Sequence, residues 1–310
     1  MAKNGQKQDK RIDVKIGFQC NNRCRFCVQG NKRETCPDKT AGEVRLILKK
    51  MVKNYKEVVF TGGEPTLRKE LADWVKYAKT LGYKSIQIQT NGRLLSYMDY
   101  CKKMVASGAN EFSPAIHGSK AQIHDYLTRS PGSFEQTVQG IKNLKSLNQY
   151  ILTNTVITKH NYKDLPNIAK LLVGLGVNQF QFAFIHINQI IAHDPTLIKE
   201  IVPRYAEVEP FVKKGLEIGI KAGVRAMAEA IPYCFMKGYE ESVAERVIPE
   251  SAVFDADFST RDYSKYRKTK GKAKGPKCLK CKYYLICEGP WREYPGIFGW
   301  AEFKPITTGK

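Results

Sequence analysis

Apolar runs recur along the first two thirds of the chain, separated by segments whose apolar residues repeat at helical spacing. The first run, 12–18, alternates polar and apolar positions, which is typical of a half-buried strand. The same reasoning predicts strands at 12–18, 57–61, 84–89, 110–118 (with its exit loop), 151–157 and 179–185. It predicts helices at 40–54, 67–81, 97–107, 120–128, 134–147 and 165–175.

Six strand-then-helix units predict an α/β fold with parallel strands and helical crossovers. A partial (βα)6 barrel of the triose-isomerase type over residues 12–190 fits this count, and chemistry in such barrels gathers where the strands end. Residues 1–11 are polar and basic and predict a flexible arm. The alternation stops after about residue 189, so 191–310 is expected to hold a helical linker, broken near Pro203 and Pro210, and a small C-terminal domain.

The composition is that of a globular protein, with 42% hydrophobic residues in a chain of 310. No apolar run approaches the length of a membrane span, and the first residues lack an apolar segment, so we expect a cytoplasmic protein without a membrane span. Nine cysteines in a reducing compartment favour metal or cluster ligation over disulfides. Cys36 has no partner at ligand spacing and Cys101 falls on an apolar helix face, so neither is expected to be a ligand.

The formal net charge is +21, from 51 basic and 30 acidic residues. Such a balance favours polyanionic partners such as RNA or nucleotide phosphates, but it also fits a lysine-rich solvated surface. The excess is spread along the chain, with a local basic run at 265–277. That run either grips phosphates or is a solvated loop.

Three cysteines, Cys20, Cys24 and Cys27, directly follow the first predicted strand. Three thiolates closing on one centre leave a tetrahedral site one ligand short, whereas a three-cysteine [4Fe–4S] cluster keeps one iron free to bind another molecule. A zinc knuckle with a distant fourth ligand is the alternative.

The C-x3-C-x-aromatic-C pattern of Cys20–Cys27 is joined by Gly62-Gly63-Glu64-Pro65 and Thr90-Asn91-Gly92, each at the exit of a predicted strand. These three motifs, in this order, resemble the radical S-adenosylmethionine (radical SAM) superfamily over about residues 12–190. The resemblance implies the (βα)6 fold and a [4Fe–4S] cluster whose fourth iron is chelated by S-adenosylmethionine. It also implies an electron donor such as a flavodoxin or ferredoxin, and a 5′-deoxyadenosyl radical that abstracts hydrogen from a substrate.

The resemblance suggests roles for residues beside the cysteines. Phe26 would offer an aromatic face near the adenine, or it packs the loop. Gly62 and Gly63 would let the backbone approach the ligand, with carbonyls that accept from its ammonium group.

Polar residues at the next strand exits are weaker candidates. Glu64 is an acceptor near the same ligand or a helix cap. Asn91 and Ser113 would lie near the ribose hydroxyls, or they satisfy turns. His117 and His186 also fall at predicted strand exits, but neither is assigned a catalytic role.

A second cysteine set lies near the C-terminus, with Cys278, Cys281 and Cys287 in C-x2-C-x5-C spacing and a lone Cys234 upstream. This array resembles the SPASM/twitch extensions of radical SAM enzymes and implies one auxiliary [4Fe–4S] cluster. The same cysteine spacing also permits a four-cysteine zinc site.

The expected function is therefore that of a radical SAM enzyme that acts on a peptide or protein, or on a small metabolite. Modification of RNA or a nucleotide is the alternative that the charge favours. A non-enzymatic iron–sulfur or zinc-binding nucleic-acid module is a third interpretation.

Overall fold

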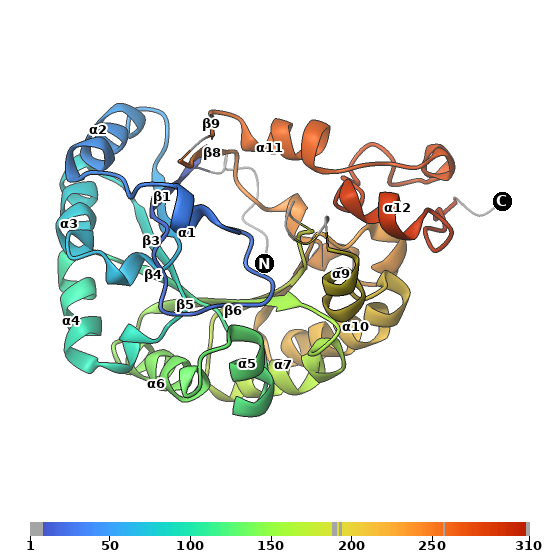
Figure 1. The fold of residues 1–310 in the computed structure, drawn as a ribbon, viewed down its shortest axis with the longest axis horizontal. Coiled ribbons are helices and arrows are strands. Elements are labelled where there is room, and N and C mark those ends of the chain that lie inside the picture. The colour runs from blue at the N-terminus through green and yellow to red at the C-terminus, as the bar shows by residue number, and fades with distance from the viewer. Residues whose placement is uncertain (1–8, 188–190, 192–193, 257, 308–310) are drawn as a thin grey trace.

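The computed structural model describes residues 9–187, 191, 194–256 and 258–307. Its centre is one curved sheet in the order β7-β6-β5-β4-β3-β2-β1-β8-β9, in which every pair is parallel except β8 with β9 (Figure 1). The strands are β1 (Arg11–Gly17), β2 (Glu57–Gly62), β3 (Ser85–Thr90), β4 (Glu111–Pro114), β5 (Tyr150–Ile157), β6 (Gln179–Phe184), β7 (Arg225–Glu229), β8 (Ser251–Phe254) and β9 (Ser259–Thr260). The sheet does not close, so the α/β class and the partial barrel are confirmed.

Helices cover the outer side of this sheet, and the C-terminal elements lie where the barrel is open (Figure 1). The helices are α1 (Lys32–Thr35), α2 (Ala41–Met51), α3 (Leu71–Leu81), α4 (Met98–Ser107), α5 (Ala121–Thr128), α6 (Ser133–Ser146), α7 (Leu165–Gly174), α9 (Pro195–Ile201), α10 (Tyr205–Lys221), α11 (Tyr263–Tyr266) and α12 (Glu293–Phe298). None of these described helices combines the length and the apolar composition needed to cross a bilayer.

Local sequence signals explain where several elements begin and end. Thr40 and Glu43 form a reciprocal capping box at the start of α2. Gly82 ends α3 in the left-handed conformation, as expected for a glycine after a helix. Cys101 is fully buried in α4, which confirms that it is a core residue.

The inner face of the sheet is polar. The buried positions of β1, such as Ile12 and Val14, face the helices, and the alternate positions of the strands face inward. Thr61 donates to Gln89 across β2 and β3 at 3.0 Å, and Gln181 donates to Glu229 across β6 and β7. Barrels of this type usually fill their interior with branched apolar side chains, so a polar interior suits a polar ligand.

The later part of the chain differs from the sequence prediction in two respects. The alternation does not stop, because β7 pairs with β6 and β8 pairs with β1, both in parallel. The predicted helical linker breaks between α9 and α10 around Pro203, but Pro210 lies inside α10, where one lost backbone hydrogen bond is tolerated. The division of the chain at residue 190 stays a prediction.

The end of the predicted N-terminal arm is structured. Residues 1–8 lie outside the described part. The Lys10 carbonyl accepts from the Lys56 amide, and Arg11 begins β1. The sheet therefore starts one residue before the predicted strand.

A carboxylate at the amino end of β2, Glu57, gives the fold a pH dependence. Burial, and then the neighbouring Glu111, raise the pKa of Glu57 to about 7. The unfolded chain therefore loses a proton near pH 4.5 that the folded chain keeps, so the free energy of unfolding falls between about pH 4.5 and 7. We expect Glu57→Gln to equal the wild type at pH 4.5 and to exceed it by roughly 1–2 kcal/mol at pH 8, after discounting for solvent screening. Denaturant unfolding at the two pH values measures this, and a variant without a gain at pH 8 contradicts it.

Candidate active site

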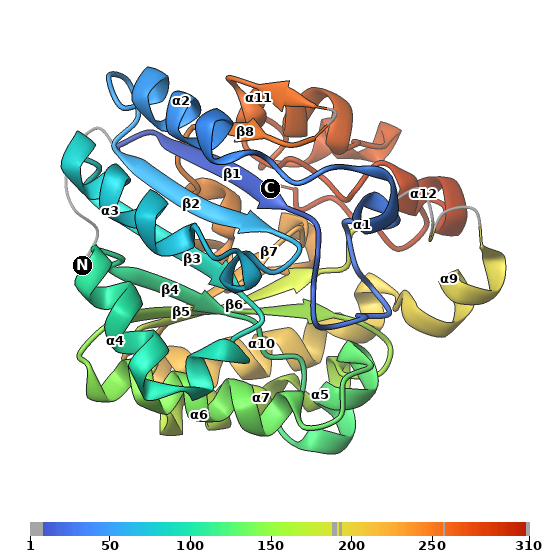
Figure 2. The same cartoon turned by 60° about the vertical axis from the view of Figure 1, so that its left-hand side comes forward.

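The loop that carries Cys20, Cys24 and Cys27 leaves β1 and passes beyond the ends of the neighbouring strands before it reaches α1 (Figure 2). All three thiols are partly exposed, and a tight turn joins the last two, in which the Cys27 amide donates to the Cys24 carbonyl at 3.2 Å. Burial raises the pKa of Cys24, and the charges of Cys27 and Cys20 raise it further. The Cys24 sulfur is thus within electrostatic reach of the other two, and a bound metal would favour its thiolate form.

Main-chain contacts fasten this loop to the end of α5. The Arg23 amide donates to the Thr128 carbonyl and the Arg25 amide to the Leu127 carbonyl, both at 2.9 Å. The guanidinium of Arg25 lies 4.1 Å from the centre of the Tyr126 ring. The loop is therefore held at its middle as well as at its ends.

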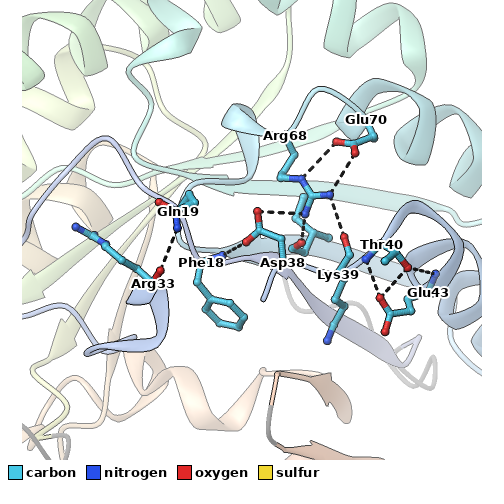
Figure 3. Close-up of polar contacts among 10 residues, drawn as sticks. Phe18, Gln19, Arg33, Asp38, Lys39, Thr40, Glu43, Arg68 and Glu70 are labelled. Carbon is cyan, nitrogen blue, oxygen red and sulfur yellow. Dashed lines mark hydrogen bonds and ion pairs between the residues drawn. The ribbon is translucent and has the colours of Figure 1, made fainter. Parts of the chain in front are cut away.

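Asp38 and Arg68 fix the entrance to the loop (Figure 3). One oxygen of Asp38 accepts from the Phe18 amide at 2.8 Å, and the other lies 3.7 Å from the Arg68 guanidinium. Arg68 also donates to the Lys39 carbonyl at 2.9 Å and pairs with Glu70. This partly buried arginine ties the segment after α1 to the end of β1, where it also donates to the Ile16 carbonyl.

The two glycines at the end of β2, Gly62 and Gly63, allow a close approach between backbones. Gly62 has a φ of +135°, and a Cβ there would lie 2.1 Å from the Gly17 carbonyl oxygen. A Cβ on Gly63 would lie 2.4 Å from the carbonyl oxygens of Phe18 and Gln19. Glycine is therefore required to seat this turn against the entrance of the cysteine loop. Contact with a ligand, as the sequence suggested, stays a prediction.

Glu64 is the most buried charged group of the site. Its Oε1 accepts from the Thr66 amide at 3.0 Å and from the hydroxyls of Thr66 and Thr90 at 2.6 Å. Its Oε2 accepts from the Asn91 amide at 2.6 Å. Burial raises the pKa of Glu64, and these hydrogen bonds oppose the rise. The carboxylate caps the short turn Pro65–Leu67 and also ties the second motif to the third.

Asn91 links that motif to the cysteine loop. Its Nδ2 donates to Asn21 Oδ1 at 2.6 Å and lies 3.9 Å from Cys20 Sγ. Arg93 donates to Asn22 Oδ1 at 3.1 Å. Sequence reasoning missed Asn21, Asn22 and Arg93, although the Asn-Asn pair lies within the cysteine signature itself.

Phe26 and Ser113 take different positions. Phe26 is buried and meets the edge of His117, with ring centres 4.6 Å apart, which is the loop-packing alternative. Burial lowers the pKa of His117 well below its ordinary value, and its Nδ1 accepts from the Val156 amide at 3.3 Å. His117 is therefore a neutral core residue. Ser113 is buried on β4 in register with Gln89 of β3.

His186 lies just beyond β6 and stacks on Trp291, with ring centres 4.1 Å apart. The buried ammonium of Lys272 lies 3.9 Å from the centre of the same indole. Burial, then the charges of Lys272 and Lys15, lower the pKa of His186 to about 4. This contact packs the C-terminal part of the chain against the strand ends.

The second cysteine set converges on one pocket. Cys234, Cys278, Cys281 and Cys287 all line a cavity of ≈ 410 Å³, counted up to its open mouth. Burial raises the pKa of Cys234, and the charges of the other three thiols raise it further. The structure thus brings the distant Cys234 to the three cysteines that are close in sequence.

Within the part of the chain that the structure describes, no three His, Cys, Asp or Glu side chains are arranged to hold a metal ion. The donor chemistry of the two sites is nevertheless that of iron–sulfur ligation, since thiols are the ligands that such clusters take from proteins. One site offers three thiols and the other offers four.

A family model described as the radical SAM superfamily matches residues 14–172, slightly more than half of the chain. An AdoMet-dependent heme synthase of Oleidesulfovibrio alaskensis is 29% identical over 170 residues, which cover 53% of this chain and 42% of that protein. A probable GTP 3′,8-cyclase of Saccharolobus islandicus is 29% identical over 179 residues, which cover 56% of each chain. The chain thus spans about half the length of the curated relatives that it matches.

Solved structures resemble a larger share of the chain. SuiB of Streptococcus suis, bound to the precursor peptide SuiA, superposes with a TM-score of 0.68 at 16% identity and covers 97% of this chain and 74% of that one. Native anSMEcpe with bound AdoMet gives a TM-score of 0.66 at 14% identity and covers 92% of this chain and 89% of that one. At these identities the likeness concerns the fold, and it extends beyond residue 172 into the C-terminal part.

Proposed function

The chain belongs to the radical SAM superfamily, and from this we propose that it is an enzyme that cleaves S-adenosylmethionine at a [4Fe–4S] cluster held by Cys20, Cys24 and Cys27. When bound, the cluster and S-adenosylmethionine supply one-electron chemistry that yields methionine and a hydrogen-abstracting 5′-deoxyadenosyl radical. The observation that carries the proposal is the direct linkage of the three motifs. Glu64 binds the Asn91 amide, and Asn91 contacts both Asn21 and Cys20.

The residues of the chain have separate tasks in this proposal. The three thiols hold three irons and leave the fourth for the amino and carboxylate groups of S-adenosylmethionine. Gly62 and Gly63 keep a backbone turn against the cluster loop, and Glu64 fixes the amide of Asn91 beside it. Asn91 and Ser113, at the ends of β3 and β4, are assigned to the nucleoside, with Phe26 packing beneath the loop.

The proposal is tested by incubating the anaerobically reconstituted protein with dithionite and S-adenosylmethionine. We expect 5′-deoxyadenosine and methionine in equal amounts. If neither forms while the Cys20–Cys24–Cys27 site is fully loaded with iron, the enzymatic proposal is wrong.

We further propose that residues 191–310 include a twitch-like region with one auxiliary [4Fe–4S] cluster on Cys234, Cys278, Cys281 and Cys287. The pocket that all four thiols line supports this assignment. Four protein ligands would saturate the cluster, which favours electron transfer or a structural role over substrate binding.

Cys234→Ala tests the fourth ligand. The wild-type protein is expected to hold about eight irons per chain, and the variant about four after gel filtration, because a cluster with three protein ligands is more easily lost. Cys36→Ala is the matched control, since that partly exposed thiol belongs to neither set. Iron and zinc analysis of anaerobically purified protein gives the result. A Cys234→Ala protein that keeps all its iron, or a wild type that holds zinc at this site, contradicts the assignment.

For the substrate, we propose a peptide or protein, or a small metabolite. The relatives support this breadth, because the curated ones are a heme synthase and a probable GTP 3′,8-cyclase, and SuiB was solved with a precursor peptide. RNA is the second candidate, favoured by the net charge of +21. Retention of unrelated tRNA across a salt series decides this, and no retention at low salt removes RNA.

A further inference from the structure

The loop around the second cysteine set is strongly basic. Residues 263–287 contain no aspartate or glutamate. Seven lysines of this stretch are exposed, namely Lys265, Lys268, Lys270, Lys274, Lys277, Lys280 and Lys282. Two acids flank the stretch: Glu288 is buried in a two-contact ion pair with Arg267, and Asp262 accepts from the Lys265 amide at 2.8 Å. Much of the positive charge of this stretch therefore faces solvent, and Glu240 is an acidic group whose charge interacts with Lys282.

The same loop exposes large aliphatic side chains between its cysteines. Leu285 is 91% exposed, Leu279 69% and Ile286 57%. The sulfurs on either side of them point into the thiol-lined pocket, so these side chains stand on the outside of the proposed auxiliary site. Exposed aliphatic groups inside a charged surface are typical of protein interaction sites.

We propose that the segment 274–287 is the docking surface for an acidic one-electron carrier protein of the flavodoxin or ferredoxin class. The inference rests on the proposed function, because it makes the auxiliary site the place where reducing equivalents enter. In each encounter the carrier loses one electron and this protein gains it. The lysines supply charge complementarity and steer the association, and the aliphatic side chains supply a small apolar contact.

The chemistry of the protruding side chains favours a protein over a nucleic acid. Single-stranded nucleic acids are bound by exposed aromatic rings on which bases stack. The side chains exposed between Cys278 and Cys287 are leucine, isoleucine and lysine, whereas Tyr283 and Tyr284 are only partly exposed. Tyr283 stacks on Tyr233, which leaves one face of its ring occupied.

The experiment compares two triple variants of the holoprotein. The loop variant carries Lys277→Glu, Lys280→Glu and Leu285→Ser. The control carries the matched changes Lys49→Glu, Lys50→Glu and Leu46→Ser on the exposed side of α2, which keeps the net charge equal. Two quantities are measured for each protein, namely the Kd for an oxidised acidic flavodoxin at several salt concentrations and the yield of 5′-deoxyadenosine with reduced flavodoxin or with dithionite.

We expect the loop variant to bind flavodoxin at least about tenfold more weakly at low salt, with the control within about twofold of the wild type. The flavodoxin-driven yield should fall in parallel, while the dithionite-driven yield is unchanged. Equal weakening in both variants, or none in either, overturns the inference and leaves the proposed function intact. The inference also fails if the loop variant no longer binds tRNA or anionic vesicles but binds flavodoxin with the wild-type Kd. Failure of dithionite to drive any cleavage in the wild type instead refutes the proposed function.

Discussion

Cys24→Ala is expected to lower the formation of 5′-deoxyadenosine by more than about a thousandfold, because only two of the three thiols that hold the cluster would remain. Bound iron should fall from about eight to about four per chain, with the auxiliary site still loaded. Burial raises the pKa of the Cys24 thiol, and the charges of Cys27 and Cys20 raise it further, so Cys24 lies close to both other sulfurs. Anaerobic activity and iron assays on the reconstituted variant measure both effects.

Cys36→Ala is the control for this experiment as well. Like Cys24, Cys36 lies between β1 and β2 in the sequence and is partly exposed. It directly follows α1, however, and belongs to neither cysteine set. It should keep full iron content and activity. If Cys24→Ala keeps activity, or if Cys36→Ala loses it, the wrong thiols have been assigned to the cluster.

Glu64→Gln is expected to lower the free energy of unfolding by about 2–4 kcal/mol. Each carboxylate oxygen accepts a backbone N–H, from Thr66 on one side and from Asn91 on the other. A glutamine has only one oxygen, so its NH2 group must face one of these donors and leave it unpaired in a buried place. The Asn91 turn should then loosen beside Cys20, and the affinity for S-adenosylmethionine should fall with it.

Denaturant unfolding of the apoprotein and equilibrium binding of S-adenosylmethionine by the holoprotein measure these two effects. Glu135→Gln, an exposed residue in the first turn of α6, is the control and should cost less than about 1 kcal/mol. A Glu64→Gln protein as stable as the wild type would show that Glu64 does not organise the site as a charged acceptor.

The first six strands and their helices could be predicted because each has a long apolar pattern and clear boundary residues. The alternation in 12–18 and the glycine after α3 are local signals that packing did not override. β7 and β8 could not be predicted in this way. β8 has four residues, and β7 reads Arg-Ala-Met-Ala-Glu, in which two alanines give a weak strand pattern. Their pairing depends on the edges that β6 and β1 offer.

The site, like the fold, has residues that the sequence could predict and residues that it could not. Spacing alone indicated Cys20, Cys24 and Cys27 and the trio Cys278, Cys281 and Cys287, because the members of each trio are close in sequence, whereas Cys234 lies far upstream. It could not reveal that Glu64 binds Asn91 or that Arg93 holds Asn22, since these contacts form only where three strand exits meet. The close approach of Gly62 and Gly63 to the backbone of residues 17–19 could not be predicted either, and their contact with a ligand stays a prediction.

The central claim, a cluster with one open iron that binds S-adenosylmethionine, is tested most directly by electron paramagnetic resonance. The sample is the reduced Cys278→Ala/Cys281→Ala variant, in which only the Cys20–Cys24–Cys27 site is expected to carry a cluster. We predict a [4Fe–4S]⁺ signal whose g values shift when S-adenosylmethionine is added, because the open iron gains nitrogen and oxygen ligands. A loaded cluster whose spectrum is identical with and without saturating S-adenosylmethionine would contradict the claim.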